Sequence, residues 1–179
     1  MKEKNFQKMF DVDRLEYNLR ISSLYLTAYE LLKSSIVDRL VSFFSDFNYK
    51  DGKPVKTLEY KNELNKFDKN DKFRASCLWL HDMKALDMKD VTEILKIREH
   101  RNEIAHELAK FLIDDTQEID INKFHSINNL LKKVDVWWII NFEMTIMPDF
   151  NINSEQGVNE VESGNMLLLE YLISKVKIS

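Results

Sequence analysis

The stretch that decides the fold is residues 13–47, DRLEYNLRISSLYLTAYELLKSSIVDRLVSFFSDF. Its apolar residues recur at the three- and four-residue intervals of an α-helix, and Asp11 or Asp13 is suited to cap the first turn. About 35 helical residues would span about 50 Å, more than the width of a small domain. We therefore expect a bend near the serine pair at 22–23 or the pair at 34–35.

The rest of the chain also shows helical periods. A lysine-rich connection at about 48–71 contains Gly52 and Pro54, and it is expected to be a solvated loop with room for a short helix through Leu58. A mildly basic flap beside an anionic ligand is the alternative for this connection. Helices are then expected at about 70–86, 91–113, 120–148 and 166–176, with a polar loop at 151–163.

Composition favours the same fold class. Only three glycines and two prolines occur among 179 residues. An all-β domain needs turn residues far more often than that. The sequence therefore predicts one all-α domain over residues 1–179, a bundle of about five main helices without a sheet.

Several classes of protein are disfavoured. Cys77 is the single cysteine, so no internal disulfide and no cysteine-based zinc site is expected, and its apolar neighbours indicate a core residue. The chain has no apolar run long enough for a membrane span and no signal-peptide core at its amino end, so we expect no membrane partner and a cytoplasmic location. A net charge of -4 argues against a protein that coats duplexes, although it leaves room for a local anion site.

The candidate functional segment is residues 96–106, KIREHRNEIAH. On a helical wheel, Arg101 falls in the middle of the apolar stripe, where a leucine would be expected. A guanidinium there stays charged, so it needs a carboxylate, a bound anion or a partner chain. The two interpretations are an ion pair with a glutamate elsewhere in the chain and an anion-binding site.

His106 lies off that stripe, on a face shared with Asn102 and Glu99. Asn102, one turn earlier, could hydrogen-bond one imidazole nitrogen and leave the other for proton transfer. Taken alone, His106 would more often be a solvated helix histidine. Ala105 and Ala109 beside this face are small enough for a second helix to approach closely.

Residues 101–106, RNEIAH, resemble the signature of the HEPN superfamily of small helical-bundle proteins. That signature is an arginine, a polar residue and a histidine, with four to six residues between the arginine and the histidine. The resemblance covers about a dozen residues. Arg74 and His81 also have a permitted spacing, but Ala75 follows that arginine and the residues between look like core, so we take that match to be accidental.

The resemblance implies a metal-independent endoribonuclease of a toxin–antitoxin or phage-defence system, without a cofactor. Two protomers would form a cleft that contains both copies of the motif, and an antitoxin protein is a possible partner. RNA would be cut by attack of a ribose 2′-hydroxyl on the adjacent phosphate.

The same resemblance assigns roles to five residues. His106 would be the general acid or base, Arg101 would bind the scissile phosphate, and Asn102 would orient the site. Arg98 and Glu99 would bind substrate on the same helix.

Other chemistry finds little support in the sequence. There is no Gly-rich phosphate loop, and His81, His100, His106 and His125 lack the paired spacing of metal ligands, so no metal site is expected. His100 and His125 are expected at the surface. The alternative function is a non-catalytic, HEPN-like nucleotide-binding or protein-interaction module, which the acidic net charge and the lack of an obvious basic groove favour.

Overall fold

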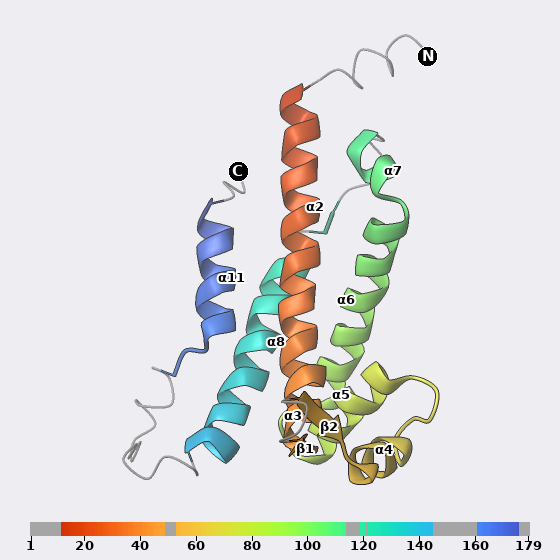
Figure 1. Cartoon of the computed structure of the whole chain (residues 1–179). Coiled ribbons are helices and arrows are strands. Elements are labelled where there is room, and N and C mark those ends of the chain that lie inside the picture. The colour runs from red at the N-terminus through yellow and green to blue at the C-terminus, as the bar shows by residue number, and fades with distance from the viewer. Residues whose placement is uncertain (1–11, 49–52, 114–118, 121, 145–160, 176–179) are drawn as a thin grey trace.

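The computed structural model of the chain describes residues 12–48, 53–113, 119–120, 122–144 and 161–175. Over these ranges the protein is an all-α bundle, which confirms the predicted fold class. Figure 1 shows α2, α6, α8 and α11 running along one long axis. Within the described ranges, five helices of 11 to 22 residues form the bundle: α2 (Val12–Lys33), α5 (Lys72–Asp82), α6 (Met88–His106), α8 (Asn122–Trp138) and α11 (Gly164–Lys175).

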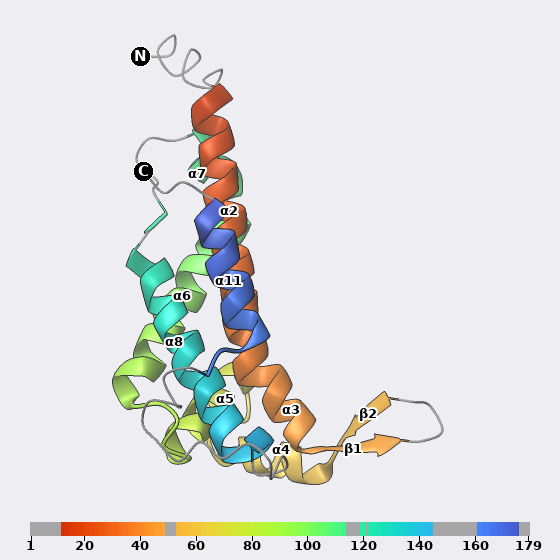
Figure 2. The ribbon, with the colours of Figure 1, turned by 90° about the vertical axis from the view of Figure 1, so that its left-hand side faces the viewer.

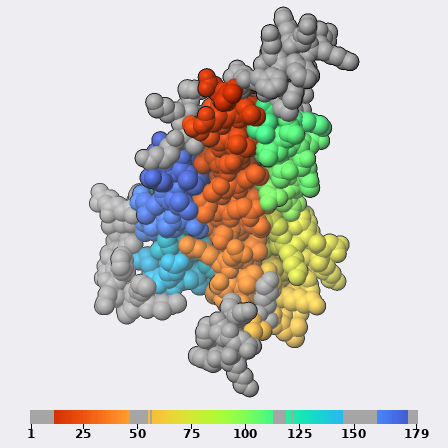
Figure 3. Space-filling model, turned by 45° about the horizontal axis from the view of Figure 1, so that its top comes forward, coloured from red at the N-terminus to blue at the C-terminus, as the bar shows by residue number. Residues whose placement is uncertain are grey.

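Helix α2 is the central element of the bundle. It packs against α6 and α7 (Leu108–Ile113) and also against α8 and α11. Figure 3 shows one face of the molecule, with α2 lying between α11 and the segment formed by α6 and α7. The side chains of Tyr25, Ala28 and Leu32 on α2 are fully buried in the core. Because α2 touches four other helices, its apolar residues hold the bundle together.

The bend predicted for the long N-terminal helix lies at the second serine pair. A π-helical turn, η1 (Ser34–Asp38), separates α2 from α3 (Arg39–Phe43). Two side chains of α8 hold this turn. The Ser35 hydroxyl donates to Asp135 Oδ1 at 2.5 Å, and the Ser35 carbonyl accepts from Trp138 Nε1 at 3.0 Å. Side chains that hydrogen-bond to the backbone of a helix, and so compete with its own hydrogen bonds, are a common cause of irregular turns.

A short β-hairpin follows α3, and the sequence did not predict it. Strands β1 (Ser45–Asn48) and β2 (Lys53–Lys56) pair antiparallel, so the long N-terminal segment leaves the helical conformation after Phe43 and not near residue 47. Figure 2 shows the hairpin extending away from the bundle. Alternation of apolar and polar residues is the sequence pattern that predicts a hairpin. These strands have only four residues each and show no clear alternation.

The remainder of the connection at 48–71 contains the short helix that the sequence allowed. Helix α4 (Leu58–Asn65) begins after Thr57, whose hydroxyl accepts a hydrogen bond from the Tyr60 backbone N–H at 3.3 Å. Tyr60 and Leu64 are buried against the core. The connection is thus anchored by its second half and is not a plain solvated loop, while Gly52 lies outside the described residues.

The predicted helix at 91–113 is in fact two helices. Helix α6 begins at Met88 because Asp87 and Asp90 form a capping box, in which each carboxylate accepts the backbone N–H of the other residue at 2.8–2.9 Å. The helix ends at His106, since Glu107 leaves the helical conformation with φ −118° and ψ 27°. No glycine or proline marks this break, so periodicity alone could not reveal it.

Helices α8 and α11 lie against α2 and against each other. Helix α8 continues into a π-helical turn, η2 (Ile139–Glu143), and its predicted end near 148 lies outside the described residues, as does most of the polar loop at 151–163. Helix α11 begins two residues before the predicted start at 166. Ser163 explains this start, because its hydroxyl accepts the Met166 N–H at 3.1 Å.

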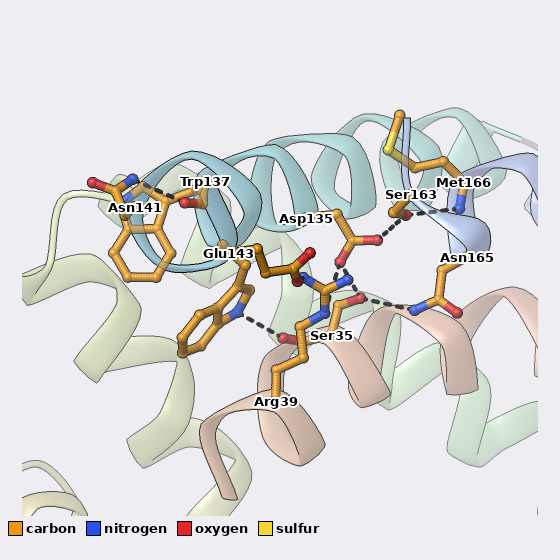
Figure 4. Close-up of polar contacts among 10 residues, drawn as sticks. Ser35, Arg39, Asp135, Trp137, Asn141, Glu143, Ser163, Asn165 and Met166 are labelled. Carbon is orange, nitrogen blue, oxygen red and sulfur yellow. Dashed lines mark hydrogen bonds and ion pairs between the residues drawn. The ribbon is translucent and has the colours of Figure 1, made fainter. Parts of the chain in front are cut away.

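A buried polar network joins α8 to η1 and α11 (Figure 4). Asp135 is fully buried, and its two carboxylate oxygens accept hydrogen bonds from the hydroxyls of Ser35 and Ser163. Arg39 Nε lies 3.7 Å from Asp135 Oδ1, and Arg39 Nη1 donates to Glu143 Oε1 at 2.9 Å. The Asp135 carboxylate therefore ties together three segments of the chain, which are α8, the turn η1 and the start of α11.

The prediction that Cys77 is a core residue is confirmed. Cys77 is buried, and burial raises the pKa of its thiol to about 12. Trp138 is buried and stacks on Trp79, with ring centroids 6.1 Å apart, while Trp137 is half-buried. Across the described ranges, none of the helices has the length and apolar character needed to span a bilayer.

Candidate functional site

The candidate site lies on the C-terminal half of α6. Ile97 and Ile104 are fully buried, and Arg101 lies between them in the stripe that the sequence predicts. The Arg101 side chain is 31% exposed, and its Nε is buried without a hydrogen-bond partner among the described residues. The guanidinium is thus at the edge of the core, where a charge requires partners.

The partner of Arg101 is a glutamate of α2. Arg101 Nη2 donates to Glu30 Oε1 at 2.7 Å, and Arg101 Cζ lies 5.3 Å from the centroid of the Tyr29 ring, a cation–π arrangement. Of the three partners that the sequence leaves open, the structure supplies the carboxylate. Glu30 and Tyr29 are the residues of the site that the sequence did not indicate, because the contact joins residues 71 positions apart.

The surroundings of these partners set their ionisation. Partial burial raises the pKa of Glu30, but hydrogen bonds from Lys33 and Arg101 outweigh it, so the pKa lies below the ordinary value of 4.5. Burial raises the pKa of Tyr29 to about 12, against the opposing effect of the Arg101 charge. At neutral pH Glu30 is therefore charged and Tyr29 is neutral.

Asn102 and His106 are exposed and lie one helical turn apart. Asn102 Oδ1 accepts a hydrogen bond from Arg101 Nη1 at 3.3 Å. No hydrogen bond joins Asn102 to His106 within the described part of the chain, so the single chain does not show the predicted fixing of the imidazole tautomer. This contact places one nitrogen of the Arg101 guanidinium against Asn102, which is one helical turn from His106.

Helix α6 ends directly after His106. The N–H of Glu107 donates to the carbonyl of Glu103 at 2.8 Å and closes the last turn, and α7 then begins at Leu108. Ala105 and Ala109 are exposed on either side of this break. Two small side chains are thus exposed close to His106, among the charged Glu103, Glu107 and Lys110.

Arg98 and Glu99, the predicted substrate-binding residues, have different surroundings. Arg98 Nη1 lies 2.8 Å and 2.9 Å from the two carboxylate oxygens of Asp71, and its guanidinium lies 5.2 Å from the centroid of the Phe73 ring. Asp71 also caps α5, so this ion pair ties α6 to α5. Glu99 is exposed to solvent.

The prediction that His100 lies at the surface is wrong. Its side chain is 12% exposed and meets the rings of Tyr25 and Phe111 edge-on, at centroid distances of 5.1 Å and 6.0 Å. Nε2 accepts the backbone N–H of Asp120 at 3.3 Å, which implies that Nδ1 carries the proton donated to Glu103 Oε2 at 3.1 Å. The wheel places His100 off the apolar stripe, but α7 and the segment before α8 cover it.

The second arginine-to-histidine pair belongs to the fold. Arg74 Nη1 donates to Asp68 Oδ2 at 2.8 Å, and His81 Nδ1 lies 3.0 Å from the carbonyl oxygen of Leu86. Five of the six residues between Arg74 and His81 are buried, which confirms the prediction that this stretch belongs to the core. His125 is exposed on α8, as predicted.

In the ranges that the structure describes, no three His, Cys, Asp or Glu side chains are grouped so that they could hold a metal ion. The charged groups around the motif are instead matched in pairs, Arg101 with Glu30 and Arg98 with Asp71. Comparisons of the chain with protein-family models, with curated proteins and with solved structures find no match.

Proposed function

We propose that this protein is a metal-independent endoribonuclease of the HEPN type, which acts as a homodimer in a toxin–antitoxin or phage-defence system. The observation that carries the proposal is the contact of Arg101 Nη1 with Asn102 Oδ1, because Asn102 is exposed and lies one helical turn from the exposed His106. A cation suited to phosphate and a group suited to proton transfer are thereby offered on one surface.

The proposed reaction needs no metal ion and no cofactor. The ribose 2′-oxygen forms a bond to phosphorus while the bond from phosphorus to the 5′-oxygen breaks, which leaves a 2′,3′-cyclic phosphate and a 5′-hydroxyl. His106 transfers one of the two protons, from the 2′-hydroxyl or to the leaving 5′-oxygen, and water exchanges the other. Arg101 binds the phosphate and stabilises the charge that develops on it, and Asn102 orients the arginine.

A dimer completes this site. Arg101 lies in the apolar stripe of α6 and His106 lies off it, so two copies of the motif across a two-fold axis would let Arg101 of one chain and His106 of the other act on one phosphate. The exposed Ala105 and Ala109 allow the close approach of helices that this arrangement requires. An antitoxin that covers the same surface would silence the enzyme.

Mixed dimers test whether the site is shared. If Arg101 of one chain and His106 of the other act on one phosphate, a dimer of one Arg101→Ala chain and one His106→Ala chain keeps one intact pair. It should then cut RNA at up to half the wild-type rate, while both homodimeric variants are inactive. Co-expression with two different affinity tags isolates the mixed dimer for this assay. A mixed dimer as inactive as the homodimers would place both groups of one site in a single chain.

Chelation should leave the activity intact. The proposed groups are side chains of α6, so cleavage of RNA by the purified protein is expected to proceed at an unchanged rate in excess EDTA. The measurement compares initial rates with and without the chelator on one labelled RNA. Loss of cleavage in EDTA and its return with one divalent metal would show that the chemistry is of a different kind.

A non-catalytic HEPN-like module is the second candidate function. The ion pair between Arg101 and Glu30 favours it, since a guanidinium that already has a carboxylate partner can serve the fold alone. The net charge of -4 points the same way. In that case the motif would support a protein contact or a bound nucleotide, and His106 would have no part in cleavage.

Expression in a bacterial host separates the two candidates. Wild-type protein, His106→Ala and the control His125→Ala, which replaces another exposed histidine, are produced at equal levels while growth and total RNA are followed. The nuclease predicts growth arrest and RNA fragments with the wild type and the control but not with His106→Ala. Equal growth and intact RNA in all three cultures would favour the non-catalytic module.

A further inference from the structure

Glu30 binds two cations with its two carboxylate oxygens. Oε1 accepts from Arg101 Nη2 and Oε2 accepts from Lys33 Nζ, both at 2.7 Å. The side chains are 31% exposed for Arg101, 43% for Lys33 and 45% for Glu30. Helices α2 and α6 thus build an arginine–carboxylate–lysine cluster that solvent can reach.

This carboxylate satisfies Arg101 only in part. A guanidinium presents five N–H donors and binds carboxylate or phosphate best through two parallel hydrogen bonds. Arg101 gives one short bond to Glu30 and one longer bond, of 3.3 Å, to Asn102, and its Nε is unpaired within the described residues. A tetrahedral phosphate offers more acceptor oxygens to this guanidinium than a carboxylate that is shared with Lys33.

The guanidinium is also held in place before any ligand arrives. Tyr29 is buried, and its ring lies 5.3 Å from Arg101 Cζ. Tyr29 and Glu30 follow one another on α2, so one packs against the guanidinium and the other pairs with it. A ligand that displaces the carboxylate therefore meets a cation that is already ordered, which reduces the entropic cost of binding.

We infer that Lys33 and Arg101 form a phosphate-binding subsite, and that Glu30 is a built-in competitor which the RNA backbone must displace. The inference rests on the proposed function for the identity of the ligand. With Glu30 displaced, both cations are free to bind one phosphate. No basic groove is obvious near the motif because the nearby cations are paired with carboxylates of the same chain. Arg101 and Lys33 pair with Glu30, and Arg98 pairs with Asp71.

The test measures binding of a labelled single-stranded RNA to the full chain carrying His106→Ala, which keeps the probe intact. Adding Glu30→Gln removes the charge but keeps the length of the side chain, and it should tighten binding roughly two- to fivefold at low salt, the range expected when an exposed ion partner is removed. Adding Lys33→Ala as well should reverse this gain. It should also make the slope of log Kd against log salt shallower by about 0.7, the value of one phosphate contact on a single strand.

Glu16→Gln is the matched control. Glu16 pairs with Arg20 on the exposed surface of the same helix, so this change also removes one negative charge and frees one cation. It should tighten binding less than Glu30→Gln does. Equal gains from the two changes, or no gain from Glu30→Gln in a protein whose helical circular dichroism is intact, would overturn the subsite.

The outcomes for the subsite and for the nuclease are separable. In one outcome, Glu30→Gln tightens RNA binding more than Glu16→Gln does, but the protein with His106 intact cuts no RNA. That outcome upholds the subsite and refutes the proposed nuclease. Cleavage of RNA by the wild type without any specific effect of Glu30→Gln on binding refutes the subsite alone.

Discussion

Replacement of His106 by alanine is expected to slow RNA cleavage by about 10²–10⁴-fold, the usual loss when a general acid–base group is removed. The imidazole is exposed at the end of α6 and makes no hydrogen bond within the described part of the chain, so its loss should leave the fold intact. Initial rates on a short labelled RNA, with equal amounts of purified protein, measure the effect.

His125→Ala is the control for this substitution, because His125 is an exposed histidine on a different helix, α8. It should cut RNA at the wild-type rate. Circular dichroism should show equal helix content in both variants. A His106→Ala protein that cuts RNA as fast as the wild type would exclude proton transfer by His106 and, with it, the proposed mechanism.

Replacement of Asp135 by alanine is expected to lower the free energy of unfolding by about 2–4 kcal/mol. The carboxylate is fully buried and accepts from Ser35 and Ser163, and a buried donor left without an acceptor costs about 1–3 kcal/mol. A loss of this size is a large part of the roughly 5–15 kcal/mol that stabilises a typical domain. Urea unfolding followed by circular dichroism measures it.

Two further variants make the Asp135 result specific. Asp135→Asn keeps one acceptor oxygen and the shape of the side chain, so it should cost less than Asp135→Ala. Asp82→Ala, at the exposed end of α5, should change the stability by no more than about 0.5 kcal/mol. Because Ser163 also caps α11, hydrogen exchange in α11 should accelerate first in Asp135→Ala. An Asp135→Ala protein as stable as the Asp82→Ala protein would show that the network does not hold these segments together.

The helices were predictable because their signals are local. Apolar periodicity indicated the main elements, and the irregular turn at η1 begins at the second of the two serine pairs where a bend was predicted. The hairpin at β1 and β2 was missed because its strands lack alternation of apolar and polar residues, although Gly52 and Pro54 occur in that stretch of the sequence. The break at Glu107 was not predictable, since no glycine or proline marks it.

The candidate site likewise has a part that local sequence predicts and a part that it does not. The position of Arg101 within an apolar stripe follows from counting along one helix, and the need for a partner follows from its charge. The identity of Glu30 as that partner depends on how α2 docks against α6, which no local pattern records. His100 shows the converse, because a residue off the stripe of its own helix is covered by α7 and by the segment that ends at Asp120.

The measurement that most directly tests the central claim, that α6 carries an RNA-cutting site, is identification of the ends produced from a defined single-stranded RNA in excess EDTA. The account predicts fragments with a 2′,3′-cyclic phosphate and a 5′-hydroxyl from the wild-type protein. It also predicts cleavage slowed by about 10²–10⁴-fold with His106→Ala, and no cleavage of an RNA whose 2′-hydroxyls are methylated. Absence of cleavage by the wild-type dimer, fragments with 3′-hydroxyl ends, or cleavage of the methylated RNA would contradict it.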